Sequence, residues 1–165
     1  MLWRNFLRYV VFPSDDLNEA LEGKSVYWND DIDTIGTFVL KTIRRFEEGE
    51  NSPLLPQFKD DEDSRFGREL FNEVLKHKDE YNAIIEEALN KDSWDTDRLA
   101  FMDTVIARTA LAELLNFPKI PVSVTINEYI EIAKAYSTPK SSFFLNGLLG
   151  AAVTNLRKQG KLLKP

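Results

Sequence analysis

Two short motifs in the chain look like ligand-binding loops, but each lacks a glycine that its loop requires. The GKS tripeptide at 23–25 matches the end of a phosphate-binding loop, yet that loop needs a glycine five residues earlier, where this chain has Asn18. The acidic run at 60–63 (DDED) suggests calcium, yet an EF-hand loop starting at its second aspartate would need glycine where Phe66 stands. We therefore predict a helix C-terminus at the first motif and a solvated acidic connector at the second.

His77 is the only histidine, and the chain has no cysteine. A Ser-His-acid triad or a metal site would have to be built around this one imidazole. His77 lies between two lysines near a predicted helix C-terminus, where the helix dipole favours a cation. We expect no enzyme, no cofactor and no metal site, and the lack of cysteine indicates a reducing compartment.

The segment from Tyr136 to Phe144 has residue types suited to binding nucleic acid. Lys140 and Ser141 fall in the first turn of a predicted helix, where free backbone N–H groups favour phosphate. Phe143 and Phe144 point about 100° apart on a helix, so both cannot face the core. One of these rings, or Tyr136 just before the helix, is a candidate for stacking on an unpaired base.

Apolar residues recur every three or four positions along most of the chain, which predicts an all-α fold. No strand pattern or internal repeat competes with this period. Phe117-Pro118 ends one helix, because the residue before proline is pushed away from the α region. The chain between Asn51 and Asp63 is predicted to be a connector. The expected helices cover 2–10, 31–46, 64–77, 79–90, 97–117, a helix after Pro121, and a last helix ending near Gly160.

Two of these helices should supply much of the core. The first has Asp97 placed to cap its start, and its expected buried stripe is Leu99, Met102, Ile106, Ala110, Leu114 and Phe117. The stripe expected on the next helix is Ile126, Ile130, Ala133 and Tyr136. On the last helix, the small residues Gly147, Gly150 and Ala151 would let another helix approach closely, and core packing is the simpler interpretation.

The apolar pattern begins at the second residue of the chain with no cap before it. Leu2, Trp3 and Phe6 already stand at helical spacing. Natural domains seldom begin inside such a pattern, so we expect the chain to be a piece of a longer protein. The alternative is an ordinary short starting helix that frays.

Charge is distributed unevenly along the chain. The net charge of the 165 residues is −6, but the segment from Lys140 to Pro165 has five basic residues and no acid, so residues 1–139 carry −11. Such asymmetry permits local phosphate contact on an acidic protein. No apolar run approaches the roughly 18 residues that span a bilayer. We expect a cytoplasmic protein that does not enter a membrane.

The stretch from Asp97 to Leu156 resembles the C-terminal half of the NusB family of transcription antitermination proteins. The resemblance weakens back to Asp63, while the YWNDD stretch at 27–31 is similar to the longer version found in the Bacteroidetes group. The matching positions are Asp103, Arg108, Ala110, Glu113, Ile120, Pro121, Val124, Ile126, Asn127, Glu128, Ile132, Ala133, Lys134, Ser141, Phe144, Asn146, Gly147, Leu148 and Leu149.

This resemblance implies an all-helical NusB-like bundle of two small helical subdomains. It divides the chain into an N-terminal helical segment with connector (1–62), a NusB-like C-terminal helical domain (63–160) and a basic tail (161–165). It also implies binding of boxA-type single-stranded RNA together with a NusE-like ribosomal protein, in a complex that helps the RNA polymerase elongation complex read through terminators.

The resemblance also nominates site residues. Tyr136, Lys140, Ser141 and Phe144 are the RNA-binding candidates, and Asp103 is the candidate for contacting the protein partner. Three departures stand out. Relatives often carry an acid at Lys140 and a polar residue at Phe143, and their first helix is rich in arginine, for which Arg4 and Arg8 are a thin substitute.

Two other functions remain open at this stage. The acidic body and the missing arginine-rich helix also fit a protein-interaction module that binds no RNA of its own. A NusB-like domain also guides some RNA methyltransferases, but no methyl-donor site is found in these 165 residues. A homodimer is compatible with the first two functions.

Overall fold

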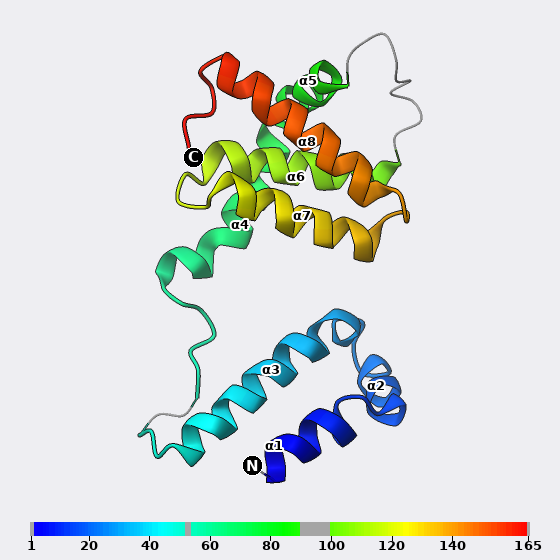
Figure 1. The fold of residues 1–165 in the computed structure, drawn as a ribbon, viewed down its shortest axis with the longest axis vertical. Coiled ribbons are helices and arrows are strands. Elements are labelled where there is room, and N and C mark those ends of the chain that lie inside the picture. Colours follow the sequence, from blue (N-terminus) through cyan, green and yellow to red (C-terminus); the bar gives the residue numbers. More distant parts are fainter. Residues whose placement is uncertain (1, 52–53, 90–99, 165) are drawn as a thin grey trace. The chain divides into compact units, whose positions relative to one another are not determined.

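The protein is all-α, as the sequence predicts. The computed structural model describes residues 2–51, 54–89 and 100–164, and every element in these ranges is a helix (Figure 1). None of these helices is long and apolar enough to cross a membrane. The helices are α1 (Leu2–Phe6), α2 (Asp15–Glu22), α3 (Trp28–Glu47), α4 (Asp61–Lys76), α5 (Lys78–Ala88), α6 (Phe101–Asn116), α7 (Val122–Tyr136) and α8 (Ser141–Lys158), with a π-helical turn at Leu7–Val11.

The chain divides into two compact units, and the first comprises residues 1–59. Within it, α1 and α2 pack against α3. Helix α2 ends at Glu22 with Gly23 as its C-cap, which confirms the helix C-terminus predicted at the GKS tripeptide. Gly36 on α3 is the only buried residue among those described in this unit. A Cβ there would lie 3.2 Å from ring carbons of Phe12, so glycine lets that ring approach the helix.

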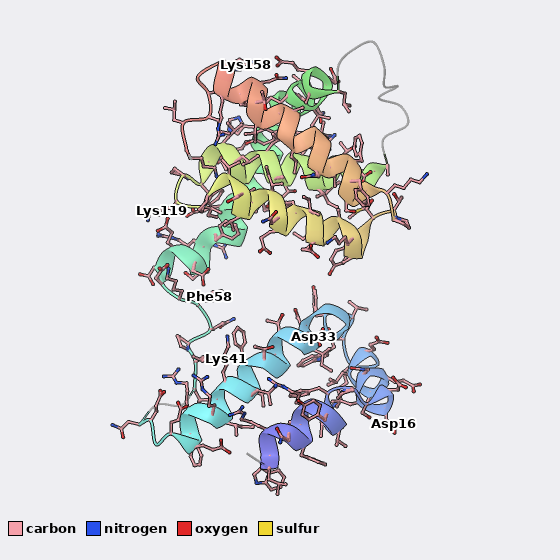
Figure 2. All side chains as sticks on the ribbon, in the orientation of Figure 1. Asp16, Asp33, Lys41, Phe58, Lys119 and Lys158 are labelled. Carbon is pink, nitrogen blue, oxygen red and sulfur yellow. The ribbon has the colours of Figure 1, made fainter. Side chains whose placement is uncertain are left out.

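The second unit comprises residues 60–165 and begins with the acidic run. The prediction that this run is a connector is wrong beyond Asp60, because α4 starts at Asp61. The Asp60 carboxylate caps the helix by accepting the N–H of Asp63 at 2.9 Å. Acidic residues in a first turn are favoured by the helix dipole. Glu62 in this turn also pairs with Lys119, which Figure 2 labels near the start of α4.

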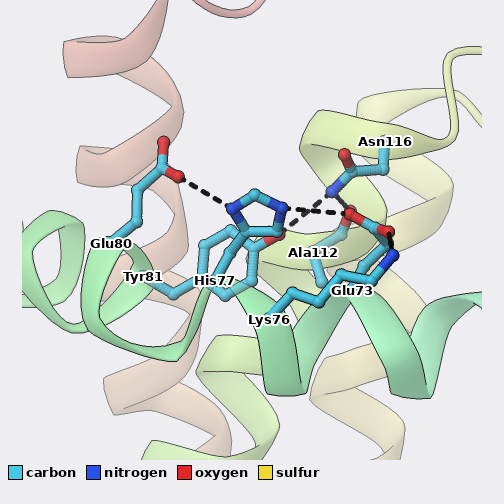
Figure 3. A network of polar contacts seen from close by, with 7 residues as sticks. All are labelled: Glu73, Lys76, His77, Glu80, Tyr81, Ala112 and Asn116. Carbon is cyan, nitrogen blue, oxygen red and sulfur yellow. Dashed lines mark hydrogen bonds and ion pairs between the residues drawn. The ribbon is translucent and has the colours of Figure 1, made fainter.

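His77 forms the corner between α4 and α5 (Figure 3). Its Nε2 lies 3.4 Å from a carboxylate oxygen of Glu73, and its Nδ1 lies 3.3 Å from one of Glu80. Below it, the buried Tyr81 hydroxyl accepts from the Asn116 amide at 3.0 Å, which ties α5 to α6. No group of acidic or imidazole side chains in the described ranges could hold a metal ion. The polar contacts of His77 thus join helices at this corner.

Helix α6 is the centre of the second unit and packs against α4, α5, α7 and α8. Of its predicted stripe, Ile106, Ala110 and Leu114 are buried as expected. Phe117 is only partly buried, and Met102 is more exposed still. Leu99 and the predicted cap Asp97 lie outside the described residues.

Of the stripe predicted for α7, Ala133 is buried, Ile126 and Ile130 are partly buried, and only the prediction for Tyr136 is wrong. The buried residues are Val122, Thr125, Tyr129 and Ala133, which places the buried face one position earlier than the apolar pattern indicates. The reason is a polar contact. The Tyr129 hydroxyl donates to the buried Glu113 carboxylate at 3.0 Å, so α7 turns this residue inward, and Tyr136 is left half exposed.

The last residues pack on the bundle. Helix α8 ends in a Schellman motif, in which the Gly160 N–H donates to the Arg157 carbonyl and the Lys161 N–H donates to the Leu156 carbonyl. Gly160 has the positive φ of +69° that this motif needs. This confirms the predicted stop. Beyond it Lys164 is buried, and its ammonium donates to the carbonyls of Glu113 and Phe117 at 3.3 and 3.1 Å. It thereby caps the C-terminus of α6.

Replacing Lys164 with Met should lower the free energy of unfolding by about 1–3 kcal/mol, because two hydrogen bonds from a charged donor are lost while the aliphatic packing is retained. Lys161→Met, at an exposed position three residues earlier, should stay within about 0.5 kcal/mol of wild type. Urea unfolding measures both. Equal stability of the two variants would contradict a capping role.

Tyr129 should make stability depend on alkaline pH. Burial raises the pKa of its hydroxyl, and the Glu113 carboxylate beside it raises that pKa further. A raised folded-state pKa stabilises the fold below the unfolded value near pH 10, and this contribution is lost as pH rises above it, by about 1.4 kcal/mol per pH unit. Tyr129→Phe should cost about 1–3 kcal/mol at neutral pH. Above about pH 10 its deficit relative to wild type should shrink, as measured by urea unfolding across pH; a constant deficit would refute this origin.

Candidate nucleic-acid interface

The start of α8 presents a cation and an aromatic ring to solvent. Lys140 occupies the N-cap position of this helix, and its side chain is exposed. A cation is disfavoured at a helix N-terminus, because the dipole is positive there. A bound phosphate would relieve this repulsion, since it attracts both the ammonium group and the first-turn N–H groups. The local electrostatics therefore favour an anion at this place.

The two adjacent phenylalanines have separate roles. Phe143 is 82% exposed, whereas Phe144 is partly buried and packs against the core. The structure thus selects Phe143 as the ring most available for stacking. Tyr136, at the end of α7, is 48% exposed and lies four residues before Lys140.

Ser141 and Asp103 lie beneath this surface. Ser141 is 1% exposed and Asp103 is 6% exposed, so neither side chain is presented to a partner in this structure. The Ser137 hydroxyl donates to the Asp103 carboxylate at 2.5 Å and lies 3.0 Å from the Ser141 hydroxyl. Of the five residues nominated from the sequence, these two are thus linked to each other through Ser137.

Phe101 is a residue that the sequence analysis did not nominate. It opens α6, two residues before Asp103, and is 76% exposed. Because Asp103 bonds to Ser137, the first turn of α6 lies beside the connection between α7 and α8 (Figure 1). The only sequence signal was an apolar residue that falls between the positions of the α6 stripe.

The basic residues of the C-terminal segment do not form one patch with Lys140. Helix α8 has 18 residues and is therefore about 27 Å long. Arg157 and Lys158 stand at its far end, where Figure 2 labels Lys158, and Lys164 is buried against α6. The interface at the start of α8 thus holds a single lysine of this segment.

The surroundings of two glycines on α8, Gly147 and Gly150, differ from the prediction made for them. A Cβ added at Gly147 or at Gly150 would meet no atom within 4 Å, apart from those of the helix itself. The expected close packing of another helix of this chain is therefore wrong for these glycines.

Comparison with known proteins shows the family. A profile of the NusB family matches residues 34–154, which run from within α3 into α8. The chain belongs to the NusB family. The solved structure of T. maritima NusB aligns with a TM-score of 0.52 and 29% sequence identity, covering 71% of this chain and 84% of that one. The all-helical NusB-like fold expected from the sequence is thereby confirmed.

Two relatives of this NusB-family chain are named "Transcription antitermination protein NusB". The protein from Salinibacter ruber is 43% identical over 99 residues, and that from Chloroherpeton thalassium is 40% identical over 95 residues. These alignments cover 60% and 58% of this chain but only 61% and 44% of the relatives' own lengths. The chain thus matches between 44% and 61% of the length of these two relatives.

The neighbouring phenylalanines should respond differently to truncation. Phe143→Ala should leave the free energy of unfolding within about 0.5 kcal/mol of wild type, because the ring is largely in water. Phe144→Ala should lower it by about 2 kcal/mol, because the ring packs against the core. Urea unfolding of the pair tests this assignment. Equal losses, or a larger loss at Phe143, would show that the outward ring is wrongly assigned.

Proposed function

We propose that this chain binds single-stranded RNA of the boxA type, together with a NusE-like ribosomal protein, as part of a transcription antitermination complex with RNA polymerase. Membership of the NusB family and the names of the two relatives support this function. The observation that carries it is the start of α8. There an exposed lysine at the N-cap and an exposed phenyl ring three residues later offer contacts for a phosphate and an unpaired base.

The proposed RNA contacts divide into electrostatic and stacking contributions. Lys140 and the first-turn N–H groups of α8 that follow Ser141 hold one phosphate of the backbone, since the Ser141 N–H itself donates to the Thr138 carbonyl. Phe143 stacks on a base, and Tyr136 and the partly buried Phe144 are further candidates. Stacking of one base on an aromatic ring contributes about 1–3 kcal/mol. Such an interface recognises an unpaired strand and not a duplex, whose bases are already stacked.

The ribosomal partner compensates for the small number of cations. Few phosphate contacts give a weak electrostatic contribution, so RNA affinity of the chain alone should be modest. A second protein bound to the same RNA adds contacts without any new residue in this chain. We therefore expect the partner and the RNA to bind with positive cooperativity.

The two contributions can be separated by titrating a fluorescent boxA-type RNA at about 50 and about 200 mM salt, with and without the ribosomal partner. Lys140→Met should weaken binding and reduce the slope of log K against log salt by about 0.7, the value for one phosphate contact on a single strand. Phe143→Ser should lose about 1–3 kcal/mol with an unchanged slope.

Lys158→Met is the matched control, because this lysine stands at the other end of α8. It should bind RNA within about twofold of wild type, a change near the noise of the measurement. A wild-type affinity for RNA that depends on neither salt concentration nor RNA sequence would count against the proposal. Binding to the ribosomal protein with none to RNA would instead support a protein-interaction module.

A further inference from the structure

A chain of hydroxyl groups runs beneath the RNA-binding surface and ends on a buried carboxylate. The Ser137 hydroxyl donates to Asp103 at 2.5 Å. The Ser141 hydroxyl lies 3.0 Å from that of Ser137 and 2.7 Å from that of Thr138, and it accepts the Thr138 N–H at 3.1 Å. Four groups from three segments of the chain thus meet at the junction of α6, α7 and α8.

Counting protons fixes the direction of this chain. Each hydroxyl has one proton to donate. The Ser137 hydroxyl uses its proton in the hydrogen bond to the Asp103 carboxylate, so its oxygen must accept a hydrogen bond from the Ser141 hydroxyl. Ser141 then has no proton left, and the Thr138 hydroxyl must donate to it. The order is therefore Thr138 to Ser141 to Ser137 to Asp103, and the Ser141 hydroxyl cannot donate to a phosphate without breaking it.

This order ties both ends of a short connection to α6. Only residues 137–140 separate α7 from α8; Ser137 is the first of them, and Ser141 directly follows the last. The Ser141 N–H also donates to the Thr138 carbonyl at 2.9 Å, which closes a turn around the connection. Lys140 directly precedes Ser141, and Phe143 follows two residues later. Their orientation thus depends on where Asp103 holds Ser137.

We propose that Asp103 is a positioning residue, which orients Lys140 and Phe143 for RNA through the hydroxyl chain and does not itself contact a partner; this inference rests on the proposed function. It replaces the expectation that Asp103 touches the ribosomal protein. The burial of Asp103 explains why it acts indirectly. A buried carboxylate without a hydrogen-bond donor is costly, so Asp103 requires its hydroxyl donor. Asp103 therefore secures the first turn of α8 from a neighbouring helix.

Amide hydrogen exchange reports directly on this junction. In Ser137→Ala and in Asp103→Leu, the amides of Thr138 and Ser141 should exchange about tenfold faster than in wild type, the change expected for one hydrogen bond to a charged group. Asp103→Asn keeps an acceptor, so its exchange rates should fall between those of wild type and those of Asp103→Leu. Ser64→Ala removes a serine hydroxyl from the first turn of α4 and should leave these amides unchanged. Should Asp103→Leu fail to fold, Ser137→Ala still tests the junction.

RNA titration of the same variants tests the consequence. Ser137→Ala should weaken binding by about three- to tenfold with an unchanged salt slope, because Lys140 is still present, whereas Lys140→Met should reduce the slope. Unchanged exchange at Thr138 and Ser141 in Ser137→Ala, or faster exchange with unchanged RNA affinity, would overturn the inference. A wild-type chain that binds no RNA would contradict the proposed function, and the exchange rates would still decide whether Asp103 holds the junction.

Discussion

Two buried carboxylates on α6 set the position of α7, and each does so by accepting a hydrogen bond from a hydroxyl group. Near the start of α6, Asp103 accepts from Ser137, and near its end Glu113 accepts from Tyr129. Burying a carboxylate without such donors would cost several kcal/mol, so α7 must pack in a position that keeps both hydrogen bonds. Together they fix the rotation of α7 and the place where the chain leaves it. The start of α8 follows from this constraint, because only four residues intervene.

The arrangement separates residues that support the surface from residues that form it. Asp103 and Ser141 are buried, and the partly buried Ser137 is hydrogen-bonded to both. Lys140 and Phe143 are exposed, at the helix end next to those contacts. A binding residue held in this manner loses less conformational freedom when its ligand arrives. At the opposite end of α6, Lys164 has a structural role, since it caps the helix.

Much of the fold could be predicted from the sequence, because its helices have clear apolar periods and clear ends. Pro118 and Gly160 mark helix ends that the structure confirms. The buried face of α7 could not be predicted, because Thr125 and Tyr129 are polar residues that a hydrophobic pattern places outside. The Tyr129 contact becomes visible only once Glu113, sixteen residues away, is brought beside it.

The exposure of the candidate site residues could be predicted from the sequence only in part. The pattern identified the start of α8 and the fact that one phenylalanine must face outward, but not which one. It also nominated Ser141, because the free N–H groups of a first turn favour phosphate, whereas here its hydroxyl is committed to Ser137. Spacing along one helix cannot reveal such a contact, because its anchor, Asp103, belongs to another helix.

The most direct test of the proposed RNA-binding surface at the start of α8 is photochemical cross-linking. A boxA-type RNA containing 4-thiouridine, bound to the chain with its ribosomal partner and irradiated, marks the residues that touch its bases, and mass spectrometry locates them. We predict cross-links within residues 136–144, with Phe143 or Tyr136 as the modified position. Cross-links confined to residues outside this segment, such as those of α3 or the far end of α8, would contradict an RNA-binding edge at the start of α8.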